Sequence, residues 1–248
     1  MRGVGCHRGD RDSGVSIRGV LFDVDDTLVD YSATVRIAIV AHLAAEGILD
    51  RFESPGSAVD RWRVIEEEEE YPRFLTGELT FKGQQLVRTR RFLAEAEVVS
   101  EDPAAWFARY AAQRDTAWAA FPDAAPVLRA LDGRVRLGVI STASRPYQIG
   151  KLRTVGLLRH FGDAVLCSDE FGAAKPDPAI FHTGCEMLGL PPEQVAYVGD
   201  RYDVDALGAR DAGLRAYWLD RAGLGGDTHD RVTVIRSLAE LDSPVAGP

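Results

Sequence analysis

The chain has 248 residues, 46% of them hydrophobic, so it can bury a sizeable core in one domain or in one domain plus a smaller one. Its formal net charge of −9 argues against a nucleic acid or an anionic membrane surface as the main partner. No apolar stretch approaches the roughly 18 residues of a membrane span, and the N-terminus shows no secretory signal. Three dispersed cysteines, Cys6, Cys167 and Cys185, offer no zinc spacing and are typical of a cytoplasmic protein, and the Arg-rich composition suggests a bacterial source.

Residues 1–16 are rich in Gly, Arg and Asp without periodicity, and we expect them to form a disordered extension. The first strand signal is the apolar run Val20–Phe22, which ends abruptly in Asp23-Val24-Asp25-Asp26-Thr27. In open α/β sheets, ligands bind at the carboxyl ends of the strands. A candidate site therefore begins at Asp23.

Asp23 and Asp25 lie on the same side of an extended chain. Two adjacent carboxylates repel each other unless a cation lies between them, and Mg²⁺ favours oxygen ligands. A carboxylate can also act as a nucleophile that accepts a phosphoryl group. The segment predicts metal-assisted phosphoryl transfer; the alternative is an Asp-rich turn that only caps a helix.

Residues 31–118 carry helical patterns and no strand signal, which predicts an all-helical insertion. Ser32 is the candidate cap of its first helix, and Gly47 lies near that helix's end. Glu66–Glu70 point in all directions around a helix, so they cannot converge on one ion and favour a solvated helix face. The further helices of the insertion are expected at about 58–70, 80–93 and 103–118.

From residue 119 onward, helices alternate with short apolar strands. The strands are expected at 135–140, 164–167, 195–198, 216–219 and 232–235, and the helices at about 124–131, 149–155, 178–188, 204–212 and 237–241. Strands spaced by helices imply right-handed βαβ units and a doubly wound parallel sheet.

Polar residues follow two more of these segments. Ser141 and Thr142 come directly after the strand at 135–140, where hydroxyl and backbone N–H groups can hold a phosphate oxygen. Lys175 precedes Pro176, which restricts it to an extended conformation. A lysine fixed in this way can neutralise both a carboxylate nucleophile and a transferring phosphoryl group.

The strand at 195–198 is the second that ends in acidic residues. Asp200 can complete a metal site with Asp23 and the backbone carbonyl of Val24. Asp205 can bind the metal through water or orient Lys175. The nearby Asp203 is a candidate cap for the next helix.

Taken in order, these motifs resemble those of the haloacid-dehalogenase superfamily over nearly all of residues 18–241. The matching residues are Asp23-Val24-Asp25-Asp26-Thr27, Ser141, Lys175-Pro176 and Gly199-Asp200 with Asp205. The insertion is similar to that family's helical cap, and the interval between Lys175 and Asp200 is too short for the alternative later cap. The resemblance implies a Rossmann-like core over 17–30 and 119–248 with an all-helical cap over 31–118.

The resemblance also implies a role for each matched residue. Asp23 would be the nucleophile that forms an aspartyl-phosphate, and Asp25 would be the acid/base. The residues that would hold the phosphoryl oxygens are Ser141, Thr142 and Lys175, with Thr27 assisting.

Mg²⁺ is the cofactor that the resemblance implies. Asp23, Asp200 and the backbone carbonyl of Val24 would bind it. Asp25 would contribute more weakly, through its backbone carbonyl or through water, and Asp205 would support the site from behind.

Three positions depart from the family pattern. Asp26 stands where the family usually has Gly, but Asp tolerates a positive φ, so we expect the turn to survive. Thr142 occupies a position often filled by Asn, and Arg201 replaces a small residue, with an ion pair or a contact to the cap both open to it.

Asp25 favours a phosphatase over a dehalogenase, because a leaving alkoxide needs a proton and a leaving halide does not. A phosphomutase is the alternative, since the same core can return the phosphoryl group to a second hydroxyl. A non-catalytic binding protein is a further alternative, although no charged core residue is missing. Phosphonate hydrolysis would require a cap lysine, and only Lys82 is available.

The cap is expected to close over the site and to select the substrate. The candidate residues are Tyr31, Phe74, Arg88, Arg91 and Arg145, although core packing explains the aromatic residues more simply and solvent exposure the arginines. A small phosphorylated metabolite, of the sugar phosphate or nucleotide class, is the expected partner of a monomer or homodimer.

Overall fold

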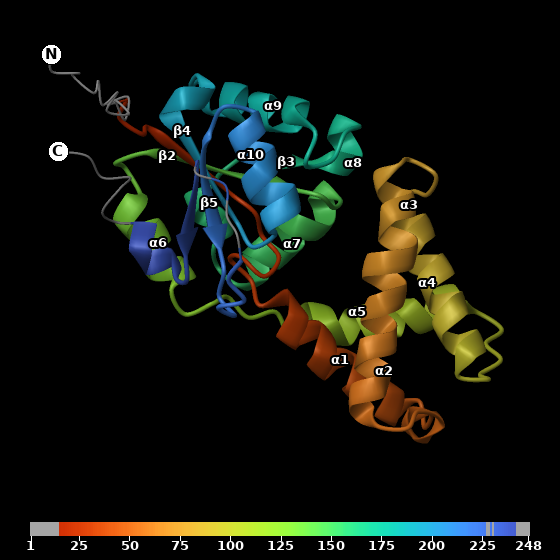
Figure 1. The fold of residues 1–248 in the computed structure, drawn as a ribbon. Coiled ribbons are helices and arrows are strands. Elements are labelled where there is room, and N and C mark those ends of the chain that lie inside the picture. The colour runs from red at the N-terminus through yellow and green to blue at the C-terminus, as the bar shows by residue number, and fades with distance from the viewer. Residues whose placement is uncertain (1–14, 227–228, 230, 242–248) are drawn as a thin grey trace, which may run out of the picture.

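The computed structural model describes residues 15–226, 229 and 231–241, so the extension expected at 1–16 lies outside the described residues except for its last two positions. The centre of the fold is a six-stranded sheet in the order β3-β2-β1-β4-β5-β6, with every neighbouring pair parallel (Figure 1). The strands are β1 (Gly19–Phe22), β2 (Arg136–Ser141), β3 (Val165–Cys167), β4 (Val195–Gly199), β5 (Arg215–Leu219) and β6 (Val232–Ile235).

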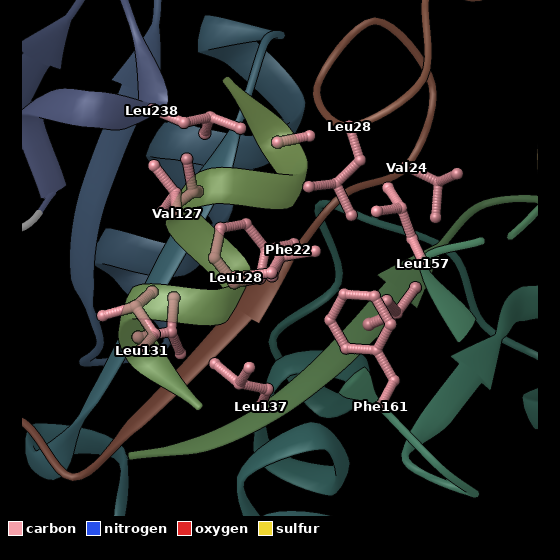
Figure 2. Packing of buried hydrophobic residues seen from close by; sticks show 14 of the residues in the cluster. Phe22, Val24, Leu28, Val127, Leu128, Leu131, Leu137, Leu157, Phe161 and Leu238 are labelled. Atoms are coloured by element: carbon pink, nitrogen blue, oxygen red, sulfur yellow. The ribbon is translucent and has the colours of Figure 1, made fainter. Parts of the chain in front are cut away.

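Helices cover both faces of this sheet, because alternate residues of the strands are apolar on both sides. Phe22 of β1 packs with Leu128 of α6 on one face (Figure 2). Leu152 of α7 belongs to the same cluster. Leu21 packs with Phe181 of α9 on the other face, together with α10. These helices are α6 (Ala124–Leu131), α7 (Arg145–Thr154), α9 (Pro178–Leu188) and α10 (Leu207–Asp211).

A second, all-helical unit is inserted between β1 and β2 and extends to one side of the sheet (Figure 1). It has its own core, in which the ring of Trp62 meets Phe92 and Tyr110 at centroid distances of 4.9 and 5.1 Å. Its elements are α1 (Tyr31–Ala45), α2 (Pro55–Val64), a π-helical segment (Ile65–Glu70), α3 (Tyr71–Leu75), α4 (Phe81–Glu95) and α5 (Pro103–Thr116). The predicted fold class, a doubly wound parallel sheet with an inserted helical cap, is confirmed.

Short helical turns complete the described chain. They are the 3-10 turns Leu49–Arg51, Leu158–His160, Pro192–Gln194 and Leu238–Leu241, the π-helical turn Tyr202–Ala206 and the helix α8 (Ser168–Phe171). Within the described residues, no helix is long and apolar enough to cross a membrane.

Two predicted helix starts are wrong. Asp30, not Ser32, caps α1, because its carboxylate accepts the N–H of Ala33 at 3.0 Å. The helix expected from residue 149 begins at Arg145, where Pro146 occupies the first turn. Asp203 does not cap the turn that follows β4, since that turn has no side-chain cap.

Candidate active site

The carboxyl ends of three adjacent strands meet at one edge of the sheet. In the register, Phe22 of β1 pairs with Val139 of β2 and Val198 of β4. Asp23 follows Phe22 directly, and its N–H donates to the Val198 carbonyl at 2.9 Å. Ser141 and Asp200 each lie two residues beyond these partners, so all three side chains reach the point where the strand order reverses.

The loop after β1 is a tight turn that folds back onto the strand end. Asp26 has a φ of 55°, so the turn expected to survive without glycine is confirmed. Its carboxylate accepts the Ser32 N–H at 2.9 Å and the Ser32 hydroxyl at 2.6 Å. Asp26 thereby ties the loop after β1 to the first helix of the cap.

Lys175 is buried at the centre of the site. Its ammonium donates to the carboxylate of Asp23 at 2.7 Å, to Asp205 at 2.6 Å and to the Tyr197 hydroxyl at 2.9 Å. Burial opposes the charged form, but the carboxylates of Asp205 and Asp23 hold the pKa of Lys175 well above its usual value. The ion pairs with these two carboxylates therefore favour the charged form of Lys175 beside Asp23.

Three carboxylates, those of Asp23, Asp200 and Asp205, have oxygens that lie within 4.8 Å of one another. Burial raises the pKa of Asp23 to about 7. Lys175 opposes this shift, and the neighbouring carboxylates of Asp205 and Asp25 add to it. Burial and the charge of Asp23 raise the pKa of Asp200 to about 9. Such a set of crowded, desolvated oxygens fits a hard divalent cation, which would remove the repulsion.

Both oxygens of Asp205 accept hydrogen bonds from the protein. One of its oxygens accepts from Lys175 and, at 3.1 Å, from Tyr197, and the other accepts the Arg201 N–H at 3.0 Å. Of the two expectations for Asp205, its contacts favour orienting Lys175 over binding through water.

The hydrogen bonds of the turn distinguish the two backbone carbonyls that the sequence proposed as metal ligands. The carbonyl of Val24 accepts the N–H groups of Leu28 and Val29, each at 2.9 Å, so both of its lone pairs are used within the turn. Among the hydrogen bonds of the described residues, none uses the carbonyl of Asp25. Of the two carbonyls, that of Asp25, which the sequence favoured less, is the one without such a hydrogen bond in the described part of the chain.

Asp25 has its own set of partners, separate from those of Asp23. Its carboxylate forms an ion pair with Lys151 and accepts the side-chain amide of Gln148 at 2.9 Å. The same amide donates to the Ser141 hydroxyl at 2.8 Å. Both residues lie on α7 and were missed from the sequence, because the expected helix began after Gln148 and left its register undefined.

Thr27 and Thr142 complete the matched motifs. The Thr27 hydroxyl donates to the Asp200 carboxylate at 3.5 Å. The Thr142 hydroxyl oxygen is buried without a partner among the described residues, and Thr142 lines the cavity above Asp23.

A cavity of about 450 Å³ lies between this edge of the sheet and the helical cap. The cap closes it through Tyr71, whose hydroxyl donates to the Thr142 carbonyl at 2.7 Å. The cap residues that line the cavity include Tyr31, Glu66, Gln84, Arg88 and Arg114, and the core adds Tyr147 and Arg201.

Not every substrate-contact candidate reaches this cavity. Tyr31 and Arg88 line it, whereas Phe74 lines a neighbouring groove. Arg91 pairs with Glu69 at 3.0 Å, and Arg145 donates to the Val165 carbonyl at 3.2 Å. Arg201 forms an exposed ion pair with Asp203 at 3.5 Å and also lines the cavity beside residues of the cap.

The expectation of a solvated glutamate face is wrong for part of the run. Glu66 pairs with Arg88, which is itself buried, and accepts the Tyr31 hydroxyl at 2.7 Å. Glu70 is buried and pairs with Arg73 at 2.8 Å. The π-helical segment turns these two side chains inward, so the buried Arg88 also departs from the expected solvated arginine.

An acidic, lysine-balanced site at the carboxyl edge of a parallel sheet, under an inserted helical cap, is the arrangement of a class of α/β hydrolases. The model of the haloacid dehalogenase-like hydrolases matches residues 17–213, and the chain belongs to this family.

Individual relatives agree with this assignment. A glyceraldehyde 3-phosphate phosphatase of Methanopyrus kandleri is 33% identical over 202 residues, which cover 80% of this chain and 82% of that protein. Among solved structures, YfnB of Bacillus subtilis bound to magnesium has a TM-score of 0.74 at 22% identity, over 93% of this chain and 99% of that one. An L-2-haloacid dehalogenase from Xanthobacter autotrophicus has a TM-score of 0.74 at 21% identity, over the same shares. Both structures match in fold.

Proposed function

We propose that the protein is a Mg²⁺-dependent phosphatase that hydrolyses a small organic phosphate monoester through an aspartyl-phosphate on Asp23. The observation that carries the proposal is the second carboxylate, Asp25, which lines the same cavity as Asp23 and is bound by Lys151 and Gln148. Hydrolysis of an alkyl phosphate needs a group that moves a proton, and Asp25 is placed to do so. The likeness to a phosphatase over most of the chain supports the same reading.

In the first half of the reaction, a carboxylate oxygen of Asp23 attacks phosphorus and the bond from phosphorus to the leaving oxygen breaks. Lys175, 2.7 Å from Asp23, balances the charge of the nucleophile and of the equatorial oxygens. Ser141 and Thr142 lie at the next strand end and offer hydroxyls to the same oxygens. Asp25 gives its proton to the leaving alkoxide.

In the second half, Asp25 takes a proton from water, and the resulting hydroxide attacks the phosphorus of the aspartyl-phosphate. The bond to the Asp23 oxygen breaks, which releases inorganic phosphate and restores the carboxylate. The buried position of Asp23, only 6% exposed, keeps other water away from the intermediate.

Asp23, Asp200 and the backbone carbonyl of Asp25 would hold Mg²⁺. When bound, the ion supplies positive charge that orients the phosphoryl group and stabilises its developing negative charge. Thr27 would hold Asp200 in place through its hydroxyl.

Asp25 also argues against dehalogenation, because a halide leaves without a proton. The likeness to dehalogenase structures is a likeness of fold and assigns no chemistry.

The cavity suits a small phosphorylated metabolite of the sugar phosphate or nucleotide class. Its volume of about 450 Å³ holds a compact organic group beside the phosphate, and Glu66, Arg88 and Gln84 supply polar contacts at the cap end. The glyceraldehyde 3-phosphate phosphatase similar to this chain supports a substrate of this size.

The test is hydrolysis of 4-nitrophenyl phosphate and of a panel of phosphorylated metabolites, with Mg²⁺ and with EDTA. We expect Mg²⁺-dependent turnover that Asp23→Asn reduces to background, while the exposed Asp211→Asn retains it. No turnover of any ester, or an Asp23→Asn variant with the wild-type rate, rules the proposal out. Transfer of phosphate to a second hydroxyl instead of water would identify a phosphomutase.

A further inference from the structure

Lys151 is a buried lysine beside the reaction centre that no matched motif includes. It is 1% exposed, and its ammonium forms an ion pair with the Asp25 carboxylate. A lysine buried in this way costs several kcal/mol of desolvation unless it is compensated. The chain contains only three lysines, and Lys151 and Lys175 both lie at this site.

Three aromatic rings complete the surroundings of the Lys151 ammonium. It lies 4.3 Å from the ring centroid of Tyr147, 4.5 Å from Trp118 and 5.0 Å from Tyr31. Ring faces attract a cation without taking its proton or competing for its hydrogen-bond acceptor. The cage therefore leaves Asp25 as the only carboxylate that pairs with Lys151 among the described residues.

Gln148 lies one turn before Lys151 on the same face of α7. It is fully buried, and its amide donates to Asp25 at 2.9 Å and to the Ser141 hydroxyl at 2.8 Å. The two oxygens of Asp25 are thus held separately, one by Lys151 and the other by Gln148. A carboxylate held at both oxygens has a fixed plane.

We propose that Lys151 and Gln148 are positioning residues that hold the Asp25 carboxylate in the orientation for proton transfer to and from the substrate oxygen. The inference rests on the proposed phosphatase function. The two lysines of the site then have separate roles. Lys175 pairs with the nucleophile Asp23, and Lys151 pairs with the acid/base Asp25. Proton transfer by a positioned group contributes about 10²–10⁴-fold to a rate, and misplacement of Asp25 forfeits that factor.

A purely structural role would affect every step alike, so the test compares two leaving groups. An alkyl phosphate needs the proton of Asp25, whereas 2,4-dinitrophenolate leaves without one. Rapid mixing with 2,4-dinitrophenyl phosphate gives a burst that reports phosphoryl transfer to Asp23 before water attacks. For Lys151→Met we expect a burst rate within about tenfold of wild type, and a loss of about 10²-fold or more in turnover of an alkyl phosphate.

The same variant should accumulate phosphorylated protein, because the return of the phosphoryl group to water also uses Asp25. Lys82→Met, an exposed lysine on α4, is the matched control and keeps both rates. Lys151→Arg keeps a cation in the cage and should recover part of the alkyl phosphate turnover.

Equal losses in the burst and in alkyl phosphate turnover would overturn the inference, and so would an unchanged variant. Thermal unfolding followed by circular dichroism checks that Lys151→Met folds. If it does not, Gln148→Met, which removes one donor to Asp25 and leaves the ion pair, must show the same selective loss. A wild-type protein with neither burst nor turnover would instead contradict the proposed function.

Discussion

The ammonium group of Lys175 lies 2.7 Å from the carboxylate of Asp23, although 152 residues separate them in the chain. Asp205 binds the same ammonium at 2.6 Å, so one cation faces two carboxylates in a buried cluster. Removing one member of such a cluster leaves charges that water cannot reach. The site is therefore coupled to the stability of the fold.

Lys175→Met should lower both activity and stability. We expect a loss of about 10²–10³-fold in turnover, because the charge that stabilises the transferring phosphoryl group is gone. The uncompensated carboxylates should reduce the free energy of unfolding by about 3–5 kcal/mol, measured with urea in the absence of metal. Lys82→Met serves as the control of equal chemistry on the surface. A Lys175→Met variant of wild-type stability would show that the cluster is solvated.

Gly199→Ala should disturb the same cluster, because the added methyl group would contact the side chain of Asp205. A Cβ at Gly199 would lie 2.4 Å from the carboxylate carbon of Asp205, and Asp205 is fixed by Lys175, Tyr197 and the Arg201 N–H. We expect destabilisation of about 1–3 kcal/mol from this overpacking, with a fall in turnover as Lys175 shifts.

The matched substitution is Gly150→Ala, in the middle of α7, where a Cβ meets nothing within 4 Å. Alanine is the better helix former, so this variant should be more stable by about 0.5–1 kcal/mol. Urea unfolding of the two variants checks the opposite signs. If both changes were equally harmless, the close approach of Asp205 to Gly199 would be wrong.

The strand ends of the site were predictable from the sequence. Asp23, Ser141 and Asp200 each follow an apolar run, and the ends of parallel strands meet at one edge of a sheet. Lys175 was predictable because Pro176 fixes its backbone. These residues are placed by local pattern and sheet topology alone.

The remaining partners depend on tertiary packing, which the sequence pattern does not encode. Gln148 and Lys151 reach Asp25 only because α7 packs with one particular face against the loop after β1. Glu66 is turned away from solvent because the buried Arg88 of a different helix pairs with it. The carbonyl of Val24 accepts hydrogen bonds from Leu28 and Val29, and these bonds form only once the turn has folded back onto the strand end.

Asp26 supplies a test of the turn that carries Asp23 and Asp25, the proposed catalytic carboxylates. Its φ of 55° is unfavourable for alanine, and its carboxylate binds Ser32 twice. Asp26→Ala should lose both features, whereas Asp26→Gly relieves the backbone and loses only the hydrogen bonds. We expect the alanine variant to be less stable than the glycine variant by about 1 kcal/mol in urea unfolding.

Asp26→Asn is the control for the hydrogen bonds, because asparagine tolerates the same φ and keeps an acceptor oxygen. It should lie closer to wild type than either of the other two variants. Alanine and glycine variants of equal stability would mean that the backbone of the turn relaxes out of the left-handed region.

The raised pKa values of Asp23 and Asp200 predict how stability depends on pH in the metal-free protein. Both lie above the usual aspartate value of 3.8, at about 7 and about 9, because burial and mutual repulsion disfavour the charged forms. At a pH between the unfolded value of 3.8 and these folded values, the two carboxyl groups hold protons in the folded protein that the unfolded chain has released. The contribution of these two groups to the free energy of unfolding is largest below about pH 4, and it is lost as the pH rises through about 7 to 9. The melting temperature in EDTA should therefore fall over this range.

Mg²⁺ would replace these protons, so the increase in melting temperature that it produces should grow as the pH rises. Melting curves with EDTA and with saturating Mg²⁺, at several values between about pH 5 and pH 9, measure this divergence. Asp200→Asn supplies the control, because its amide carries no proton to exchange and offers a weaker ligand. That variant should show a shallower pH dependence in EDTA and a smaller response to Mg²⁺. Parallel curves for the wild-type protein, with a constant Mg²⁺ effect at every pH, would contradict metal binding by this pair of carboxylates.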